Sequence, residues 1–400
     1  MDRVVVAPDP ARAPCLHRAP AAVRRVRAQR FLSLFDCPAQ APPYPGHGCC
    51  RGPTLLPGRC PPPTGQPDRH QTARRRRPQA RLLRPREHLF YHVQVAAPEP
   101  RLVDVDYLEV ECKSALNPVK NMGFAWSLNP YTGCEHRCAF CYVRAFELRA
   151  DRPSDSRYGR TVRIKTNIAA VLRSELSRRS WRKETVVIGA ATDPYQPAEG
   201  RYRLTRQCLE TFRDFSNPAA MITRGPMIVR DIDVLAGLAR RAKLHITFSI
   251  PTIDDDVWRK TEPGTAHPRQ RLRAIEKLVA AGIDVGVGMA PILPGLTDRP
   301  EQLEAVVKAA RAAGATGLWA GMLHLKDGTR QHFMSVLAHH WPELVPRYER
   351  AYRDRAYLPP SFGDTTMQTV SKLRSQHGVS DRRRVILKPP PEPEQLTLLN

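Results

Sequence analysis

Three cysteines within eight residues constrain this chain more than any other feature. Cys134, Cys138 and Cys141 stand in the line NPYTGCEHRCAFCY, which covers residues 129–142. Three thiolates at this spacing, on a loop that begins at Gly133, can converge on a single [4Fe-4S] cubane. Three protein ligands for four irons leave one iron open for another molecule. The spacing therefore predicts a reactive iron–sulfur cluster with these three cysteines as its ligands.

Two other interpretations of the loop remain open. A structural zinc site could use the three cysteines together with His136, because three cysteines and one histidine are a familiar zinc ligand set. His136 lies between two of the ligands, however, and would have to turn inward. Three buried cysteines without a metal are the second alternative, but Glu135, His136 and Arg137 make the loop polar. We favour the cluster.

The first 95 residues differ in composition from the rest of the chain. They contain 17 Arg, no Lys, 16 Pro and five acidic residues, which gives a net charge of 17 − 5 = +12 out of +24 for the whole chain. Without sustained apolar periodicity such a segment cannot form a core, so we predict a disordered extension over 1–95. It is either a basic arm for nucleic-acid phosphates or a passenger without selected structure, and we favour the passenger.

Beyond residue 105 the pattern changes to short apolar runs that alternate with helical segments, as is typical of βα units around a parallel sheet. The six expected strands are 124–128, 185–189, 219–223, 244–250, 284–289 and 316–323. The five expected helices are 169–178, 205–214, 231–241, 268–281 and 300–313. Six units are too few to close an eight-stranded barrel. The predicted fold is therefore α/β, an open partial (β/α)6 barrel whose polar residues gather at the carboxyl ends of the strands.

The pattern divides the chain into the extension over 1–95, a core domain over 96–345, and a C-terminal helical element with a Pro-rich tail over 346–400. Residues typical of helix ends and helix starts flank several of the expected helices of the core domain. Gly282 and Gly314 stand just after helical segments, where a left-handed residue is wanted. Thr205 and Thr297 stand near helix starts, where a hydroxyl can cap backbone amides.

The residues around the cysteines resemble a known family. Cys134-x3-Cys138-x2-Cys141, with aromatic Phe140 before the last cysteine, is similar to the signature of the radical S-adenosylmethionine (radical SAM) superfamily. Further motifs resemble its spore photoproduct lyase-like branch, often labelled DNA repair photolyase: TDPYQPAE at 192–199, LTR at 204–206 and PILPGLTD at 291–298. The resemblance covers about 105–345. It implies a radical SAM core domain of the partial-barrel type, with a [4Fe-4S] cluster and S-adenosylmethionine as cofactors.

The resemblance also implies a reaction and a set of contacts. A reduced cluster would pass one electron to the sulfonium of S-adenosylmethionine, giving a 5′-deoxyadenosyl radical that abstracts a substrate hydrogen. The electron would come from a donor such as a flavodoxin or a ferredoxin. The positions that match the family's cofactor contacts are Phe140, Tyr142, Thr192, Asp193, Arg224, Ser249 and Ala290.

Each of these contacts has an expected role. Phe140, Tyr142 and Ala290 are expected near the adenine or the cluster loop. Thr192 and Asp193 are expected at the methionine amino group, Arg224 at its carboxylate, and Ser249 at the ribose or the carboxylate. Three of these roles compete with plain structural ones: ordinary core packing for the rings, a turn before Pro194 for the 192–193 pair, and a solvated surface position for Arg224.

Two further positions bear on the resemblance. Glu262 and Arg271 resemble branch positions near the cofactor, although a buried ion pair that organises a helix start explains them equally well. Spore photoproduct lyase has a cysteine directly before the Thr/Ser-Asp segment, and this cysteine returns a hydrogen atom to the product radical. This chain has Ala191 at that place. The same repair reaction is therefore in doubt, and the catalytic residues stay unassigned.

The last residues suggest a partner. Gln395-Leu396-Thr397-Leu398-Leu399, on a Pro-rich tether, resembles the short peptide by which bacterial replication and repair proteins dock on the DNA sliding clamp. A disordered end without function is the alternative. No apolar run of roughly 18 residues and no signal core occur, which predicts a cytoplasmic protein without a membrane partner.

The sequence therefore favours a radical SAM enzyme, lyase-like in kind, that acts on DNA or another nucleic acid in repair or modification. One alternative is a radical SAM enzyme that modifies a peptide or a small metabolite, because the same cluster would serve both reactions. A second alternative, from another class, is a zinc-dependent nucleic-acid-binding module, which the basic charge permits.

Overall fold

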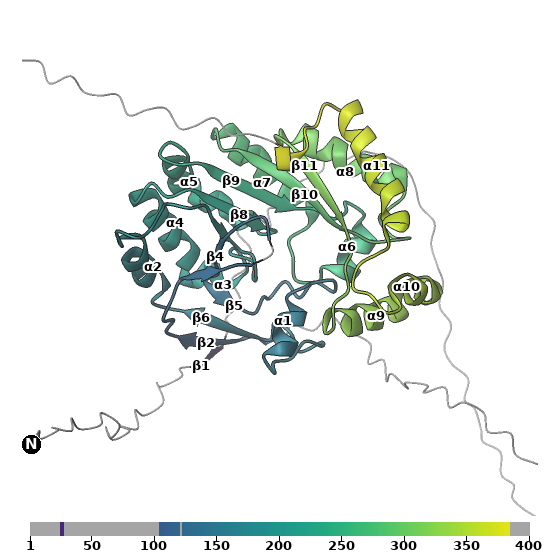
Figure 1. The fold of residues 1–400 in the computed structure, drawn as a ribbon, viewed down its shortest axis with the longest axis horizontal. Coiled ribbons are helices and arrows are strands. Elements are labelled where there is room, and N and C mark those ends of the chain that lie inside the picture. Colours follow the sequence, from purple (N-terminus) through teal and green to yellow (C-terminus); the bar gives the residue numbers. More distant parts are fainter. Residues whose placement is uncertain (1–24, 28–103, 121, 385–400) are drawn as a thin grey trace, which may run out of the picture. The chain divides into compact units, whose positions relative to one another are not determined.

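The computed structural model of the chain describes residues 25–27, 104–120 and 122–384. These residues belong to one compact unit of the chain. Most of the expected extension over 1–95 and the expected clamp-binding segment Gln395–Leu399 lie outside the described residues. Figure 1 shows the arrangement of the helices and strands.

The main sheet has seven strands in the order β11-β10-β9-β8-β7-β4-β3. Six of them are parallel to their neighbours: β4 (Trp126–Leu128), β7 (Val186–Ile188), β8 (Ala219–Thr223), β9 (Leu244–Ser249), β10 (Val285–Ile292) and β11 (Leu318–Met322). The short β3 (Leu116–Pro118) pairs antiparallel with β4 at one edge. The sheet order does not close on itself, so the predicted open (β/α)6 partial barrel is confirmed.

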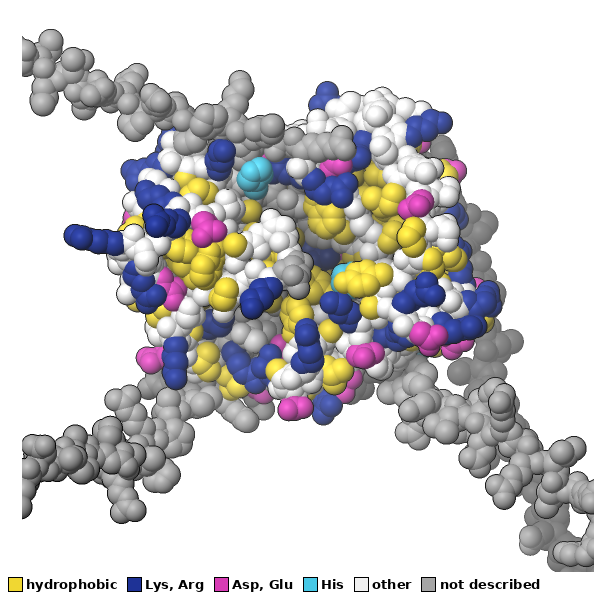
Figure 2. Space-filling view, in the orientation of Figure 1, with side chains coloured by type: hydrophobic (Ala, Val, Ile, Leu, Met, Phe, Trp, Pro, Cys, Tyr) yellow, Lys and Arg dark blue, Asp and Glu magenta, His cyan; other side chains and the backbone are white. Residues whose placement is uncertain are grey.

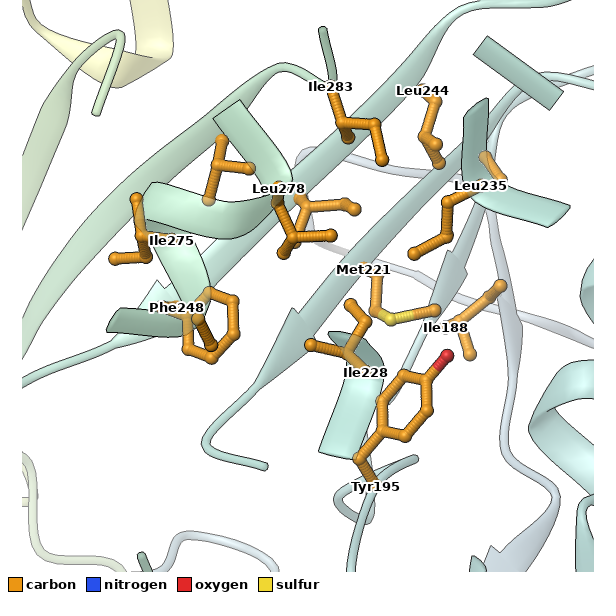
Figure 3. Close-up of a cluster of buried hydrophobic side chains, with 14 of the residues drawn as sticks. Ile188, Tyr195, Met221, Ile228, Leu235, Leu244, Phe248, Ile275, Leu278 and Ile283 are labelled. Carbon is orange, nitrogen blue, oxygen red and sulfur yellow. The ribbon is translucent and has the colours of Figure 1, made fainter. Parts of the chain in front are cut away.

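Helices alternate with these strands as expected. They are α2 (Ile168–Leu176), α4 (Leu204–Asp214), α5 (Ile232–Ala239), α7 (Pro268–Ala280) and α8 (Pro300–Ala312). The core lies between the strands and these helices. In Figure 3, Met221 and Phe248 of the sheet face Leu235 of α5 and Leu278 of α7, and all four side chains are buried. Each such side chain contributes roughly 1.5 to 3 kcal/mol by leaving water.

The expected glycines at two helix ends are right, but the two expected hydroxyl caps at helix starts are wrong. Gly282 and Gly314 have φ values of +76° and +78°, in the left-handed region that glycine tolerates. Thr205, however, donates its hydroxyl to the carbonyl oxygen of Pro194, and Thr297 accepts from the amide of Leu293. The carboxylate of Glu199 takes the place of a hydroxyl cap at α4 by accepting from the amide of Thr205 at 2.9 Å.

A second sheet, which the sequence did not reveal, holds the start of the cysteine loop. Its order is β1-β2-β6-β5, built from β1 (Arg25–Arg27), β2 (Asp106–Val110), β6 (Thr161–Lys165) and β5 (Tyr131–Thr132). Strand β1 pairs antiparallel with β2, so the prediction of disorder throughout 1–95 is wrong at this strand. The physical reason is that an open sheet edge pairs through backbone groups, which composition does not report.

The remaining helices are α1 (Arg144–Arg149), α3 (Ala198–Tyr202), α6 (Asp255–Thr261), α9 (Thr329–His340), α10 (Val345–Tyr352) and α11 (Pro360–Gln376), together with three short 3₁₀ turns. Helix α11 packs on α8 and β11, and its Val370 and Leu373 join the main core. The C-terminal helical element expected after residue 345 therefore completes the core around β11. Across the described ranges, none of the helices combines the length and apolar character needed to cross a membrane.

Candidate active site

The cysteine loop runs from β5 to α1, at the carboxyl end of the first barrel strand (Figure 1). Cys134 and Cys138 are buried and Cys141 is partly buried. The amide of Arg137 donates to the carbonyl of Cys134, and the amide of Cys141 donates to the carbonyl of Cys138. These two turns form because residues between the ligands fold back on the preceding carbonyl groups. They fix the backbone of the loop between the three cysteines.

Hydrogen bonds to two helices, α6 and α9, also hold this loop. The amide of Ala139 donates to the carbonyl of Thr261 in α6 at 2.8 Å. The hydroxyl of Thr329, the first residue of α9, donates to the carbonyl of Cys141 at 3.0 Å. Both anchoring residues lie more than 120 residues after their bonding partners in the loop.

The thiols lie in an environment that suits a cationic metal centre. Burial raises the pKa of the Cys138 thiol to about 12. Burial also raises the pKa of Cys134, and the charges of Asp193, Cys138 and Cys141 raise it further. Such thiols ionise only with a compensating cation. A [4Fe-4S] cluster held by the three cysteines supplies this charge, so the residues fit the expected group.

The zinc alternative receives no support from the geometry. His136, the expected fourth ligand, does turn inward, but its Nδ1 lies 3.3 Å from Oδ2 of Asp193. Its side chain is buried in this pair with the strand end after β7.

A buried arginine organises the loop. The guanidinium of Arg144 donates to the carbonyl oxygens of Ser154 at 2.8 Å and Asp155 at 2.6 Å. It also donates to Arg137 at 3.2 Å and to Cys138 at 3.3 Å, both within the loop. The positive charge therefore faces backbone dipoles, and it ties the loop to the segment that follows α1.

Tyr158 links this arginine to a predicted ligand. The Arg144 guanidinium carbon lies 4.5 Å from the centre of the Tyr158 ring, and the Tyr158 hydroxyl lies 3.7 Å from the sulfur of Cys141. Tyr158 is buried and packs with Cys134 and Val143.

The expected strand-end residues Thr192 and Asp193 both contact the site. Thr192 donates its hydroxyl to the carbonyl of Gly133 at 2.7 Å. The carboxylate of Asp193 accepts from the hydroxyl of Thr223 and the amide of Arg224, each at 2.7 Å, and faces His136. Burial opposes ionisation of the Asp193 carboxyl. The charge and hydrogen bond of His136, together with the hydrogen bonds from Thr223 and Arg224, outweigh this effect and lower the pKa of Asp193 to about 2.

Arg224 belongs to a buried network of charges. Its Nε donates to Oε1 of Glu262 at 2.8 Å, and Nη1 of Arg271 lies 3.1 Å from the same oxygen. The side chains of Glu262 and Arg271 are fully buried, so the buried ion pair weighed from the sequence is present. The solvated position weighed for Arg224 is wrong, because its side chain is only 20% exposed and lies over the ring of Phe140 at 5.6 Å.

The other expected contacts join this network. Arg271 donates to the backbone carbonyl of Ser249 at 2.9 Å, and the Ser249 hydroxyl donates to the carbonyl of Ala290 at 3.2 Å. Tyr142 donates its hydroxyl to the carbonyl of Ala190, next to the 192–193 segment. The fold therefore places five of the seven expected cofactor contacts at or near the carboxyl ends of β7, β8, β9 and β10, whereas Phe140 and Tyr142 lie in the cysteine loop itself.

Several site residues escaped the sequence reasoning. Arg144 and Tyr158 carry no local signal, because their contacts with the loop arise from packing and not from a residue pattern. Gln196 is fully buried, donates to Gly133 and Thr192, and accepts from the amide of Glu135 at 3.0 Å. Its place within the TDPYQPAE motif was the one available signal.

Comparison with known proteins agrees with this geometry. The model of the "Radical SAM superfamily" matches residues 128–310. An uncharacterized protein of Mycobacterium tuberculosis is 39% identical over 298 residues, which cover 74% of this chain and 87% of that protein. The radical SAM Nalpha-GlyT isomerase of Pseudomonas phage M6 is 28% identical over 168 residues, 42% of this chain and 33% of that protein.

Among solved structures, this chain is similar to spore photoproduct lyase complexed with dinucleoside spore photoproduct. The TM-score is 0.51 at 15% identity, over 68% of this chain and 79% of that chain. At this identity the likeness concerns the fold.

Proposed function

Because the chain belongs to the radical SAM superfamily, whose cofactors are a [4Fe-4S] cluster and S-adenosylmethionine, we propose that it abstracts a hydrogen atom from a nucleic-acid substrate. The observation that carries this proposal is the cysteine loop: two buried thiols and one partly buried thiol after a strand end, backed by the buried cation of Arg144. When bound and reduced, the cofactors supply a 5′-deoxyadenosyl radical, which takes the substrate hydrogen. The chain's own residues supply ligands, orientation and exclusion of water.

We assign roles to the surrounding residues from the side-chain atoms that are still available to bind the cofactor. The Nε of Arg224 is used by Glu262, and for its two Nη groups no bond is found within the described ranges, so we assign them to the methionine carboxylate. The carboxylate of Asp193 is already occupied by Thr223, His136 and the amide of Arg224. We therefore assign Asp193 to positioning Arg224 rather than to contact with the methionine amino group.

Among the remaining expected contacts, Phe140, Tyr142 and Ala290 keep their proposed places and Thr192 takes a different one. Phe140 is buried beneath Arg224, and Ala290 and Ser249 share a hydrogen bond at the ends of β10 and β9. We assign Phe140, Tyr142 and Ala290 to the adenine side. We assign Thr192 to positioning the first ligand, because its hydroxyl holds Gly133 beside Cys134.

A nucleic-acid substrate is supported by charge and by the expected clamp-binding segment. The chain has 63 Lys and Arg against 39 Asp and Glu. Basic side chains are spread over the face in Figure 2, with fewer acidic ones between them.

Ala191, which packs beside Cys134 and Tyr158, carries no thiol that could return a hydrogen atom. The proposed reaction is thus lyase-like or a modification, and it needs a hydrogen source other than residue 191.

Anaerobic reconstitution tests the proposal. The purified protein should take up about four irons per chain and form 5′-deoxyadenosine under reductant, whereas a variant with serine in place of Cys134, Cys138 and Cys141 should do neither. Turnover with a deuterated oligonucleotide, first irradiated and then intact, should move deuterium into 5′-deoxyadenosine. A single zinc per chain would refute the enzyme, and label transfer from a peptide or metabolite alone would replace the substrate class.

A further inference from the structure

A row of aromatic rings leads from the cysteine loop to the surface. Tyr142 contacts Phe146 at 5.8 Å between ring centres and His324 at 6.0 Å, and His324 stacks on Tyr357 at 5.4 Å with an interplanar angle of 20°. We call these four residues the ring row. Tyr142 directly follows the ligand Cys141, whereas Phe146 and Tyr357 are 39% and 58% exposed. One part of the row therefore lies beside the expected cluster and another faces solvent.

The rings come from three separate segments, and backbone bonds fix two of these segments to each other. Phe146 lies in α1, His324 follows β11, and Tyr357 precedes α11. His324 and Tyr357 form an antiparallel bridge, and the amide of Leu325 donates to the carbonyl of Ala356 at 2.7 Å. This pairing orders the two stacked rings without burying Tyr357. A large exposed ring that is held in place offers a stacking face at low entropic cost.

Cations accompany the exposed rings. Lys326 Nζ lies 5.9 Å from the centre of the Tyr357 ring, and the Arg149 guanidinium lies 4.9 Å from the centre of the Phe146 ring. Both residues also line a cavity of about 580 Å³ between α1 and the segments after β11 and α10, together with Arg330 and Arg355. Burial and the charge of Lys326 lower the pKa of His324, so this ring is neutral near pH 7.

Exposed aromatic faces beside ordered cations match the chemistry of an unpaired nucleic-acid strand. Every base has a π-face that stacks on an aromatic ring, and each phosphate attracts a Lys or Arg. We propose that the exposed rings of the row, Phe146 and Tyr357, stack the bases of an unpaired strand, that Lys326 and Arg149 bind its phosphates, and that the strand thereby delivers a nucleotide to the cysteine loop. This inference rests on the proposed nucleic-acid substrate. It adds which surface binds the nucleic acid and that the bound nucleic acid is single-stranded.

Binding of labelled oligonucleotides to the reconstituted holoenzyme tests the surface. Fluorescence anisotropy should show tighter binding to a single-stranded 12-mer than to its duplex, with DNA and RNA of one sequence run in parallel to identify the sugar. The Y357A and F146A variants should each weaken binding by roughly 5- to 150-fold, the factor for loss of one stacked base. K326A should lower the slope of log Kd against log salt by about 0.7.

Phe362 offers a matched control. It is 38% exposed and carries Arg347 at 5.6 Å over its ring, yet among the described residues it makes no ring contact with the row. F362A should bind within about twofold of wild type. All variants should keep the iron content, the thermal midpoint and the uncoupled formation of 5′-deoxyadenosine of the wild type.

The outcomes separate the two proposals. Equal binding by wild type, Y357A and F146A, or tighter binding to the duplex, overturns the ring row. If the wild type also moves deuterium from an oligonucleotide into 5′-deoxyadenosine, the proposed function survives that result and the ring row alone is discarded. If no oligonucleotide binds and label comes only from a peptide or metabolite, both proposals fail.

Discussion

At the scale of single residues, the cysteine loop depends on groups that are not themselves ligands. Arg144 holds two of the loop's carbonyl groups, and Thr192 and Gln196 hold Gly133. Each contact fixes backbone rather than sulfur. The direction in which the thiols point is therefore decided by neighbours that come from other turns of the chain.

Gly159 gives a direct test of this dependence. Its φ is +79°, and a Cβ added there would lie 2.2 Å from the carbonyl oxygen of Cys134. G159A should therefore push the loop away and bind much less iron after reconstitution. G282A is the control, because Gly282 has a similar φ of +76° with open space around it. Both variants should lose about 1 kcal/mol of stability from the left-handed backbone, and equal iron content in both would disprove the steric effect.

Tyr158 should tune the cluster electronically. A Cys141 thiolate bound to iron has no proton, so the Tyr158 hydroxyl, 3.7 Å away, must be the donor. A donated hydrogen bond favours the more negative, reduced state. Y158F should lower the reduction potential by roughly 40 mV, the one-electron equivalent of a hydrogen bond of about 1 kcal/mol.

A redox titration followed by electron paramagnetic resonance measures this change. Y348F is the control, since the buried Tyr348 hydroxyl has no hydrogen-bond partner within the described ranges. An unchanged potential in Y158F, or an equal shift in Y348F, would remove the assigned role.

At the scale of elements, the site residues lie at the carboxyl ends of the parallel strands. The C-terminal segment packs near the amino ends of the same sheet. Thr192, Arg224 and Ser249 all stand at carboxyl ends of neighbouring strands. Near the amino ends, Arg382 lies beyond α11 and reaches under β10. Its Nη2 lies 2.5 Å from Oδ2 of Asp284, and a Cβ at Gly286 would collide with its side chain.

Removal of Arg382 should therefore destabilise the barrel. The side chain is 4% exposed and its partner Asp284 is 17% exposed, so R382A leaves a largely buried carboxylate without its cation. We expect a loss of roughly 2 to 4 kcal/mol in the free energy of unfolding, measured by urea titration.

The neighbouring Arg383 supplies the comparison. It is 62% exposed and pairs with Asp381, so R383A should cost less than about 1 kcal/mol. A loss in R382A that is no larger than this value would show that the C-terminal segment merely rests on the sheet.

At the scale of the whole molecule, charge and the chain end bear on partners. Half of the net charge of +24 falls within 1–95, so residues 96–400 carry the other half. The expected clamp-binding segment Gln395–Leu399 lies outside the described residues and remains a proposal. Its groove-binding chemistry needs extended, apolar residues on a tether, and the Pro-rich run before it supplies the tether.

A peptide of residues 389–400 tests that partner. It should bind a purified bacterial sliding clamp in isothermal titration calorimetry, because Leu396, Leu398 and Leu399 can fill an apolar groove. A peptide with alanine at Gln395 and Leu396 should bind at least about tenfold more weakly, equivalent to roughly 1.4 kcal/mol. Equal affinity of the two peptides would dismiss the motif as a chance match.

The sequence by itself determined the barrel strands, the long helices and the three expected ligands. Strand β8 and the start of α7 lie where the apolar pattern predicted them, because periodicity within one segment reports which face is buried. Cys134, Cys138 and Cys141 were recognisable because the ligand spacing needed for one cluster is contained in a single loop.

Only the tertiary structure decided the contacts between distant segments. The pair of His136 with Asp193, the bond of Thr192 to Gly133 and the docking of Arg382 beneath β10 each join parts of the chain that no local pattern connects. The failed caps at Thr205 and Thr297 have the same cause. A hydroxyl near a helix start bonds to whichever partner packing brings closest, and at α4 the carboxylate of Glu199 had already taken the amides.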